Sequence, residues 1–293
     1  MKGMCLIKKF GKPNQKLMLK NMLNSKAQII ATLGPSSFSH EIINRMCEKQ
    51  LGVVRLNFSW QTLDEHANNI LMIRKVANER GIVLPIIQDL PGPRVQKSEG
   101  HTFNHDLADA VTDHDIELIK FGVEHGVDYI AVSFVSSAKD IIKCKEIIKA
   151  NNGKQKVIAK IERAEALENL DEIIYEADAV MVARGDLGNN IPIEKVPFVQ
   201  SDIILRCKKA GKTVIVATQM MLSMTNNTEP TRAEVTDVAE AILEGADCVM
   251  LSEETASGKY PVESVAIMER IVLEAEKHLG GKAVFDPLVR IVV

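Results

Sequence analysis

The sequence lacks long hydrophobic runs and a strong excess of charge of either sign. No stretch approaches the roughly 18 apolar residues that a membrane-spanning helix needs, although 46% of the 293 residues are hydrophobic. The formal net charge is only −3, which argues against a dedicated nucleic-acid-binding protein. These deficits exclude a membrane span and leave a globular protein that is long enough to bury a large core.

Cysteines are also few, and they follow no pattern. The five of them, Cys5, Cys47, Cys144, Cys207 and Cys248, are odd in number, widely scattered and without metal-ligand spacing. Each lies in or beside an apolar run. We therefore expect buried, reduced thiols in a cytoplasmic protein.

Acidic residues are absent from the first 26 positions, which contain seven lysines. This segment has no continuous apolar core and no small-residue cleavage site, so we do not expect a secretory signal. Residues 1–26 are predicted to form a basic arm or helix that caps the bottom of the domain. Contact with an acidic partner or a membrane surface is the alternative.

Eight strand-like runs alternate with helical segments. The runs are 27–34, 53–58, 83–91, 128–135, 157–162, 178–186, 213–220 and 247–254. This alternation predicts a (β/α)₈ TIM barrel over residues 27–280, closed by a helix at 260–279 and followed by a tail at 281–293. An open doubly wound sheet is the alternative, which is weakened because no G-x-G-x-x-G follows any strand.

Two local features accompany this pattern. Glycines near the ends of the helical segments are expected to be C-terminal caps, namely Gly52, Gly81, Gly126, Gly153, Gly211 and Gly245. The connection after the third strand, at about 96–115, is polar and longer than usual, and a loop of this length is often functional.

Charged residues follow two neighbouring strands between Lys156 and Asp186. The runs KVIAKIE and DAVMVARGD flank a helical segment, so we expect the two strands to be parallel and adjacent. Alternation along a strand places Lys160 and Glu162 on one face, and likewise Arg184 and Asp186. Because buried charge is costly unless it binds a metal or an anion, we predict a functional site here.

Polar side chains recur at the carboxyl ends of the other strands, which form the active-site rim of such a barrel. The rim residues are Thr32, Arg55, Asn57, Ser59, Asp89, Ser133, Lys160, Glu162, Arg184, Asp186, Thr218, Ser252 and Glu254. Such uniform polarity at one end of apolar strands favours a catalytic site over simple solvation.

The residue types indicate enolate chemistry. Glu162 and Asp186 are oxygen ligands suited to Mg²⁺ or Mn²⁺, and such a metal chelates a 2-oxo acid. Lys160 and Arg55 supply positive charge, and the amides of Gly185 and Asp186 are positioned to hold a substrate carboxylate. The Thr218 hydroxyl is predicted to relay a proton to the enolate carbon. A Schiff base at Lys160 is the weaker alternative, because the flanking carboxylates favour its charged form.

Long motifs over most of residues 27–279 resemble the pyruvate kinase family. The matching stretches are IIATLGPSS, GVVRLNFS, KFGVEHGVDYIAVSFV, KVIAKIE, DAVMVARGDLG with IPIEKVP, VATQMMLSM and PTRAEVTDVAEAILEGADCVMLSEETASGKYPVE. The resemblance implies a glycolytic enzyme that transfers phosphoryl between phosphoenolpyruvate and ADP, with Mg²⁺ or Mn²⁺ as cofactor. It also implies self-association, for which we expect a dimer.

The resemblance assigns roles to individual residues. Lys160 lies at the transferring phosphoryl group, Arg55 contacts phosphate, Glu162 and Asp186 hold the metal, and Thr218 protonates enolpyruvate. Other members of the predicted site are cofactor contacts (Thr32, Pro35, Asn57), a substrate contact (Ser133) and a monovalent-cation site (Asn57, Ser59, Asp89).

Departures from the family pattern fall on nucleotide and phosphoryl contacts. The lid domain after the third strand is reduced to about ten residues, and no carboxyl-terminal regulatory domain is expected. Where the family has S-H-G, this chain has Ser59-Trp60-Gln61. A tyrosine of the family is replaced by Glu65, a lysine by Ser257 and an arginine by Gln96. Arg94 stands where members that need K⁺ carry an acid, so we predict that its guanidinium replaces that cation.

Three functions therefore remain open. The first is an impaired pyruvate kinase acting on phosphoenolpyruvate and ADP. The second is a nucleotide-independent, metal-dependent decarboxylase or carbon–carbon lyase for an oxaloacetate-like 2-oxo acid. The third, a binding module without catalysis, is weaker because the residues of the metal and oxo-acid site are present.

Overall fold

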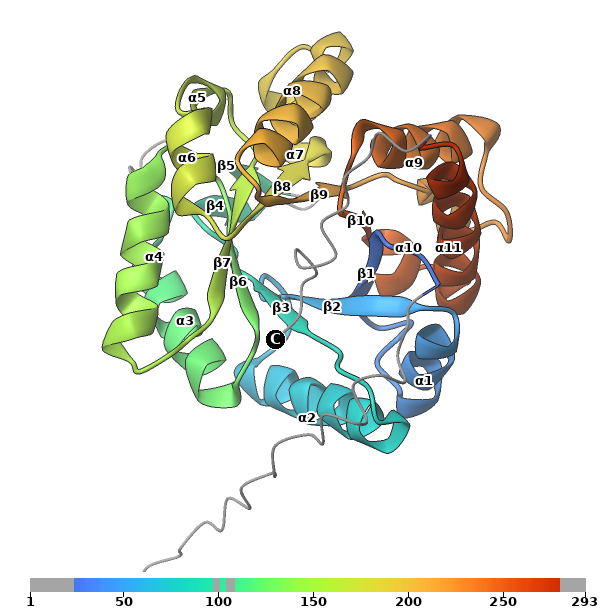
Figure 1. Ribbon diagram of the computed structural model, residues 1–293. Coiled ribbons are helices and arrows are strands. Elements are labelled where there is room, and N and C mark those ends of the chain that lie inside the picture. Colours follow the sequence, from blue (N-terminus) through green and yellow to red (C-terminus); the bar gives the residue numbers. More distant parts are fainter. Residues whose placement is uncertain (1–23, 97–100, 104–108, 280–293) are drawn as a thin grey trace, which may run out of the picture.

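The computed structural model describes residues 24–96, 101–103 and 109–279, and these form a closed barrel of eight parallel strands (Figure 1). The order around the barrel is β1–β10–β9–β8–β7–β6–β3–β2. The strands are β1 (Gln28–Leu33), β2 (Leu51–Asn57), β3 (Ile86–Asp89), β6 (Tyr129–Val132), β7 (Lys156–Ile161), β8 (Ala179–Ala183), β9 (Thr213–Ala217) and β10 (Cys248–Leu251). Each expected run contributes one strand, so the prediction of a TIM barrel is confirmed.

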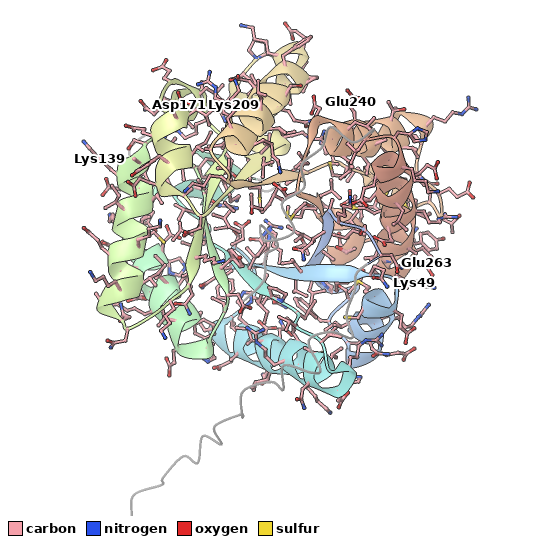
Figure 2. All side chains as sticks on the ribbon, viewed as in Figure 1. Lys49, Lys139, Asp171, Lys209, Glu240 and Glu263 are labelled. Atoms are coloured by element: carbon pink, nitrogen blue, oxygen red, sulfur yellow. The ribbon has the colours of Figure 1, made fainter. Side chains whose placement is uncertain are left out.

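Helices surround the barrel as an outer ring (Figure 1). The longer ones are α1 (His40–Glu48), α2 (Leu63–Arg80), α3 (Asp113–His125), α4 (Ala138–Ala150), α8 (Val196–Lys209), α9 (Arg232–Glu244) and α11 (Pro261–Lys277). The shorter ones are α5 (Ala164–Glu168), α6 (Leu170–Glu176), α7 (Arg184–Asn190), α10 (Glu253–Ala256) and the 3₁₀ turns η2 (Ile193–Lys195) and η3 (Leu222–Thr225). Exposed charged side chains such as Lys139, Asp171 and Glu240 lie on the outer surface of this ring (Figure 2). Among the described helices, none is long and apolar enough to cross a membrane.

Capping residues set the ends of the outer helices. Helices α2, α3 and α9 each begin with a threonine and an acid that cap one another reciprocally. The same three helices end at Gly81, Gly126 and Gly245 in the left-handed conformation, as predicted. Gly52 lies inside β2 and caps no helix, so that expectation is wrong.

Inward-facing side chains explain why the site forms at one end of the barrel. The interior cluster consists of Ile30, Val53, Ile87, Tyr129, Ala131, Ile158, Ala179, Met181, Ile215, Ala217, Cys248 and Met250. Residues two positions further along a strand face the same side. Six of these positions are polar and belong to the predicted rim, namely Thr32, Arg55, Asp89, Ser133, Lys160 and Ser252. The barrel interior is therefore apolar below and polar at the carboxyl ends of these strands.

Several elements end earlier than the sequence pattern indicates. The run 178–186 stops being a strand at Ala183, and helix α7 begins at the next residue. Strand β9 ends at Ala217 and β10 at Leu251, so Thr218 and Glu254 lie beyond their strands. The helix expected between β7 and β8 is divided into α5 and α6 at Asn169.

The connection after β3 contains more structure than the expected loop. Strands β4 (Arg94–Gln96) and β5 (His101–Phe103) pair in antiparallel fashion there. The predicted arm up to residue 23 and the tail 281–293 lie outside the described residues. Four of the five cysteines are described and are buried and unpaired, as expected, whereas Cys5 is not among the described residues.

Candidate active site

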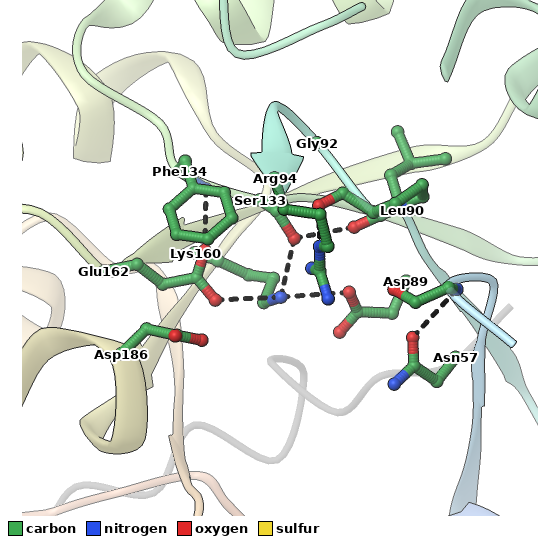
Figure 3. A network of polar contacts seen from close by, with 12 residues as sticks. Asn57, Asp89, Leu90, Gly92, Arg94, Ser133, Phe134, Lys160, Glu162 and Asp186 are labelled. Carbon is green, nitrogen blue, oxygen red and sulfur yellow. Dashed lines mark hydrogen bonds and ion pairs between the residues drawn. The ribbon is translucent and has the colours of Figure 1, made fainter. Parts of the chain in front are cut away.

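Lys160 lies at the centre of a buried polar network (Figure 3). Its Nζ lies 2.9 Å from Oδ1 of Asp89, 2.9 Å from Oε1 of Glu162 and 2.7 Å from Oγ of Ser133. Only 5% of the Lys160 side chain is exposed. These three acceptors match the three donors of an ammonium group, so the position of Nζ is fixed by strands β3 and β7 and by the residues that directly follow β6 and β7.

Asp89 joins Lys160 to a second cation. Nε of Arg55 donates to Oδ2 of Asp89 at 2.7 Å, and Nη1 of Arg55 donates to Oγ1 of Thr32 at 3.0 Å. Burial by itself would raise the pKa of Asp89, but the charges of Arg55 and Lys160 lower that pKa to about 2. The buried carboxylate therefore stays ionised and holds both cations at the rim.

Glu162 is held by a backbone group as well as by Lys160. The N–H of Phe134 donates to Oε2 of Glu162 at 2.7 Å. Phe134 has a φ of 54°, an uncommon left-handed conformation for a bulky residue, and it follows β6 closely in the chain. Burial raises the pKa of Glu162, and the negative charges of Asp186 and Asp89 add to this rise against the opposing effect of Lys160.

Asp186 lies beside Glu162, but on a helix rather than on a strand (Figure 3). The amide of Asn190 at the end of α7 donates to the backbone oxygen of Glu162 at 3.0 Å and to that of Asp186 at 2.8 Å. The prediction that Arg184 and Asp186 share one face of a strand is wrong. The chain leaves β8 at Ala183, and the side-chain period changes from 2 to 3.6 at that point.

Glu162 and Asp186 fit a divalent cation. No group of three or more His, Cys, Asp or Glu side chains suited to a metal occurs within the described parts of the chain. Mg²⁺, however, usually takes one or two carboxylates and completes its shell with water and substrate oxygens. Each carboxylate is a hard oxygen donor, and the repulsion between them that raises the pKa of Glu162 would be relieved by a cation.

Thr218 lies against the amino end of α7. It follows β9 with a φ of 74°, and the next residue, Gln219, has a φ of 56°. A Cβ atom added to Gly185 would lie 2.7 Å from Cγ2 of Thr218, so only glycine allows this approach. Arg184 contacts this turn as well, because the Thr218 carbonyl accepts from its Nη2 at 3.0 Å.

The remaining rim residues have other environments. Glu254 is buried and accepts from the N–H groups of Met221 at 3.0 Å and Ser252 at 2.7 Å, so it supports loops. Asn57 accepts from the N–H of Ser59 at 3.1 Å, and Pro35 is exposed. Arg94 donates from Nε to the carbonyl of Pro91 at 2.5 Å, and its guanidinium carbon lies 5.7 Å from the Phe134 ring centroid. The cation and cofactor roles of Asn57, Ser59, Pro35 and Arg94 stay predictions.

Two participants could not be found from the sequence. The Phe134 N–H serves Glu162 only because the backbone turns left-handed there, and a phenylalanine gives no local sign of that turn. Asp237 on α9 accepts from Nη1 and Nη2 of Arg184 at 2.6 Å each. It is one of several acids on an amphipathic helix, so nothing in its own segment marks it.

Comparisons with known proteins agree with this architecture. The family model described as pyruvate kinase, barrel domain, matches residues 24–107 and 100–265. A pyruvate kinase of Thermococcus litoralis is 38% identical to this chain over an alignment that takes in 86% of the chain and 70% of the relative. One from Sporosarcina psychrophila is 36% identical, with 88% and 58% covered, and one from Trypanoplasma borreli is 35% identical, with 89% and 68% covered.

The matches thus span between 58% and 70% of these relatives' own lengths. Their aligned lengths of 333 to 344 residues exceed the 293 residues of this chain, so many positions of the relatives have no counterpart in it. A matching family model over most of the chain, relatives above 30% identity and a closed (β/α)₈ barrel lead to one conclusion. The chain belongs to the pyruvate kinase family and contains the barrel domain of that family.

Proposed function

We propose that the protein carries out Mg²⁺- or Mn²⁺-dependent enolate chemistry on a substrate of the phosphoenolpyruvate or pyruvate type. The observation that carries this proposal is the Lys160 ammonium, fixed at 2.9 Å from both Asp89 and Glu162 at the barrel rim. An ammonium group held there without freedom to reorient is suited to stabilise negative charge that develops on a substrate oxygen.

The other residues have complementary roles in this proposal. Glu162 and Asp186 would hold the cation, which when bound polarises the oxo and carboxylate oxygens of the substrate. Arg55, anchored on Asp89, adds positive charge toward a phosphate or carboxylate. The amides of Gly185 and Asp186 would bind the substrate carboxylate, Ser133 would contact the substrate through the Lys160 network, and the Thr218 hydroxyl would move the proton at the enolate carbon.

Phosphoryl transfer to ADP is the finer proposal within this chemistry. Family membership and the intact Lys160 network favour it. We propose that the lid domain of the family is shortened in this chain, which is supported by the two matched segments meeting at residues 100–107. A shorter lid leaves the transferring group more open to water, so we propose that transfer is slower than in relatives with a lid.

A nucleotide-independent lyase or decarboxylase is the second candidate, and specific contacts favour it. Glu65, which replaces a nucleotide-side tyrosine of the family, is engaged with Thr62 in the cap of α2. Ser257, which replaces a lysine, donates to the carbonyl of Glu253 at 3.4 Å. Glu65 lacks the ring of the tyrosine, and Ser257 lacks the positive charge of the lysine. The residues proposed to act on the oxo acid, Lys160, Glu162 and Thr218, are all present.

Nucleotide binding separates the two candidates. Isothermal titration of the full chain with ADP and with ATP, and separately with oxaloacetate and pyruvate, should be carried out in Mg²⁺. Submillimolar nucleotide binding together with phosphoenolpyruvate-dependent ATP formation would support the kinase. Oxo-acid binding without nucleotide binding, with release of carbon dioxide from oxaloacetate, would support the decarboxylase. If the chain bound neither the nucleotides nor the oxo acids, the proposal would be refuted and the binding-module interpretation would be left.

A further inference from the structure

Thr218 and Gln219 occupy a strained turn directly after β9. Both are non-glycine residues at positive φ, 74° and 56°. A β-branched residue such as threonine is particularly disfavoured there. Such a conformation persists only where neighbouring groups stabilise it. The contacts of this turn therefore indicate which residues keep Thr218 in its position.

Arg184 provides the main contact to the backbone of this turn. Its Nη2 and Nε donate to the carbonyl of Thr218 at 3.0 and 3.3 Å. Its Nη1 and Nη2 also donate to the two carboxylate oxygens of Asp237 at 2.6 Å each, and Nη1 reaches Gln200 at 3.3 Å. The Arg184 side chain is 13% exposed. A planar guanidinium fixed by a bidentate carboxylate is a rigid support for the Thr218 carbonyl.

Two further contacts restrain the same turn. Gly185, the next residue after Arg184, lies so close to Cγ2 of Thr218 that a Cβ atom would meet it at 2.7 Å. On the far side of the turn, the buried carboxylate of Glu254 accepts from the N–H of Met221 at 3.0 Å. The turn is therefore held from α7 on one side and from α10 on the other.

The consecutive residues Arg184, Gly185 and Asp186 thus connect the turn at Thr218 with the carboxylate of Glu162. Arg184 holds the backbone of Thr218, Gly185 leaves room for the side chain of Thr218, and Asp186 lies next to Glu162. We propose that Arg184, fixed by Asp237, is a positioning residue that aims the Thr218 hydroxyl at the enolate carbon. This inference rests on the proposed function, because it assigns Thr218 a proton-transfer role.

The test uses exchange of the methyl protons of pyruvate with deuterated solvent, followed by ¹H NMR with the full chain and Mg²⁺. In this exchange a methyl C–H bond breaks and the proton passes through the Thr218 hydroxyl to the solvent. A deuteron from D2O then forms a C–D bond at the enolate carbon, so no reactant other than the solvent is needed. The variants are Arg184→Met, Thr218→Val and the double variant. Arg206→Met is the matched control, because Arg206 forms ion pairs on the outer surface.

Arg184→Met is expected to lower the exchange rate at saturating pyruvate by about 100-fold, the cost of a small misplacement of a reacting group, with little change in apparent KM. The double variant should exchange no more slowly than Thr218→Val, because Arg184 acts only through Thr218. Arg184→Lys, which keeps the charge but not the fork, should be intermediate, and Arg206→Met should match the unmodified protein.

An Arg184→Met variant that exchanges normally, or whose loss adds fully to that of Thr218→Val, would overturn the positioning role. If the unmodified protein does not exchange pyruvate protons, the proposed function fails, and the catalytic consequence of positioning fails with it. The positioning itself is then decided by the Thr218 methyl signal in threonine-labelled protein. That signal should shift in Arg184→Met and stay in place in Arg206→Met, and an unmoved signal in both would refute the inference.

Discussion

Lys160 and Asp89, which lie 71 residues apart in the chain, form a buried ion pair of 2.9 Å at the carboxyl end of the barrel. The pair exists because β3 and β7 both flank β6, which brings their inward-facing ends to the same layer. Removing either partner would leave the other buried charge without one of its counter-charges, which is costly.

The pH dependence of stability should report on Asp89. Its pKa falls from 3.8 to about 2 on folding, so the unfolded chain binds a proton more readily than the folded protein at acid pH. The stabilisation is present above pH 4 and is lost as the pH falls from about 4 to about 2. We expect it to amount to about 2 kcal/mol.

Urea unfolding at a series of pH values would measure this effect. The slope of unfolding free energy against pH below 4 should be smaller in Asp89→Asn than in the unmodified protein. Asp113→Asn, which changes an exposed acid on α3, should leave the slope unchanged. Equal slopes in Asp89→Asn and the unmodified protein would contradict the assignment.

Metal binding should depend on Glu162. Glu162→Gln keeps a carbonyl oxygen for the Phe134 N–H or for Lys160 but removes the negative charge. We expect Mn²⁺ affinity, followed by electron paramagnetic resonance, to fall and metal-dependent turnover to drop by about 100-fold or more, because a catalytic metal is worth several kcal/mol. Glu165→Gln, on the exposed start of α5, is the control, and undiminished turnover in Glu162→Gln would remove the metal from the mechanism.

The two glycines of α7 should respond differently to alanine. Gly185→Ala places a Cβ atom 2.7 Å from Thr218 Cγ2, so the turn must shift and activity should fall by about 100-fold. In Gly188→Ala the new atom meets the flexible end of Ile193 at 3.2 Å and Cγ2 of Val196 at an ordinary contact distance of 3.7 Å. That variant should keep its activity and gain up to about 1 kcal/mol of helix stability. Activity and thermal stability should be measured for both variants. Equal activities would show that the Gly185–Thr218 contact is unimportant.

Activity should not require K⁺. The charge of Asp89 is already matched by Arg55 and Lys160, and Arg94 adds a further cation near the same end of β3. Turnover in tetramethylammonium buffer should therefore equal turnover in K⁺ buffer. An absolute K⁺ requirement in a titration would refute the proposed role of Arg94.

The sequence carries strong signals for the barrel and for the residues that end its strands. Continuous apolar runs such as VIAKIE need two covered faces, and eight of them alternating with helical segments fit few folds other than a closed barrel. Because alternation is local, Thr32, Arg55, Asp89, Ser133 and Lys160 could all be assigned to the rim. The same local rule failed at Arg184, because hydrophobic pattern does not mark where a strand turns into a helix.

What the amino-acid sequence determined by itself was therefore the fold, the family and the set of chemical groups at one end of the barrel. Only the tertiary structure decided which of these groups meet. The Lys160 ammonium meets Asp89 from β3 as well as Glu162 from its own segment, Phe134 turns its N–H to Glu162, and Arg184 connects the Thr218 carbonyl with Asp237. Apart from the local Lys160–Glu162 pair, these contacts join segments far apart in the chain, and such pairings depend on barrel closure and on backbone turns that short-range sequence patterns do not encode.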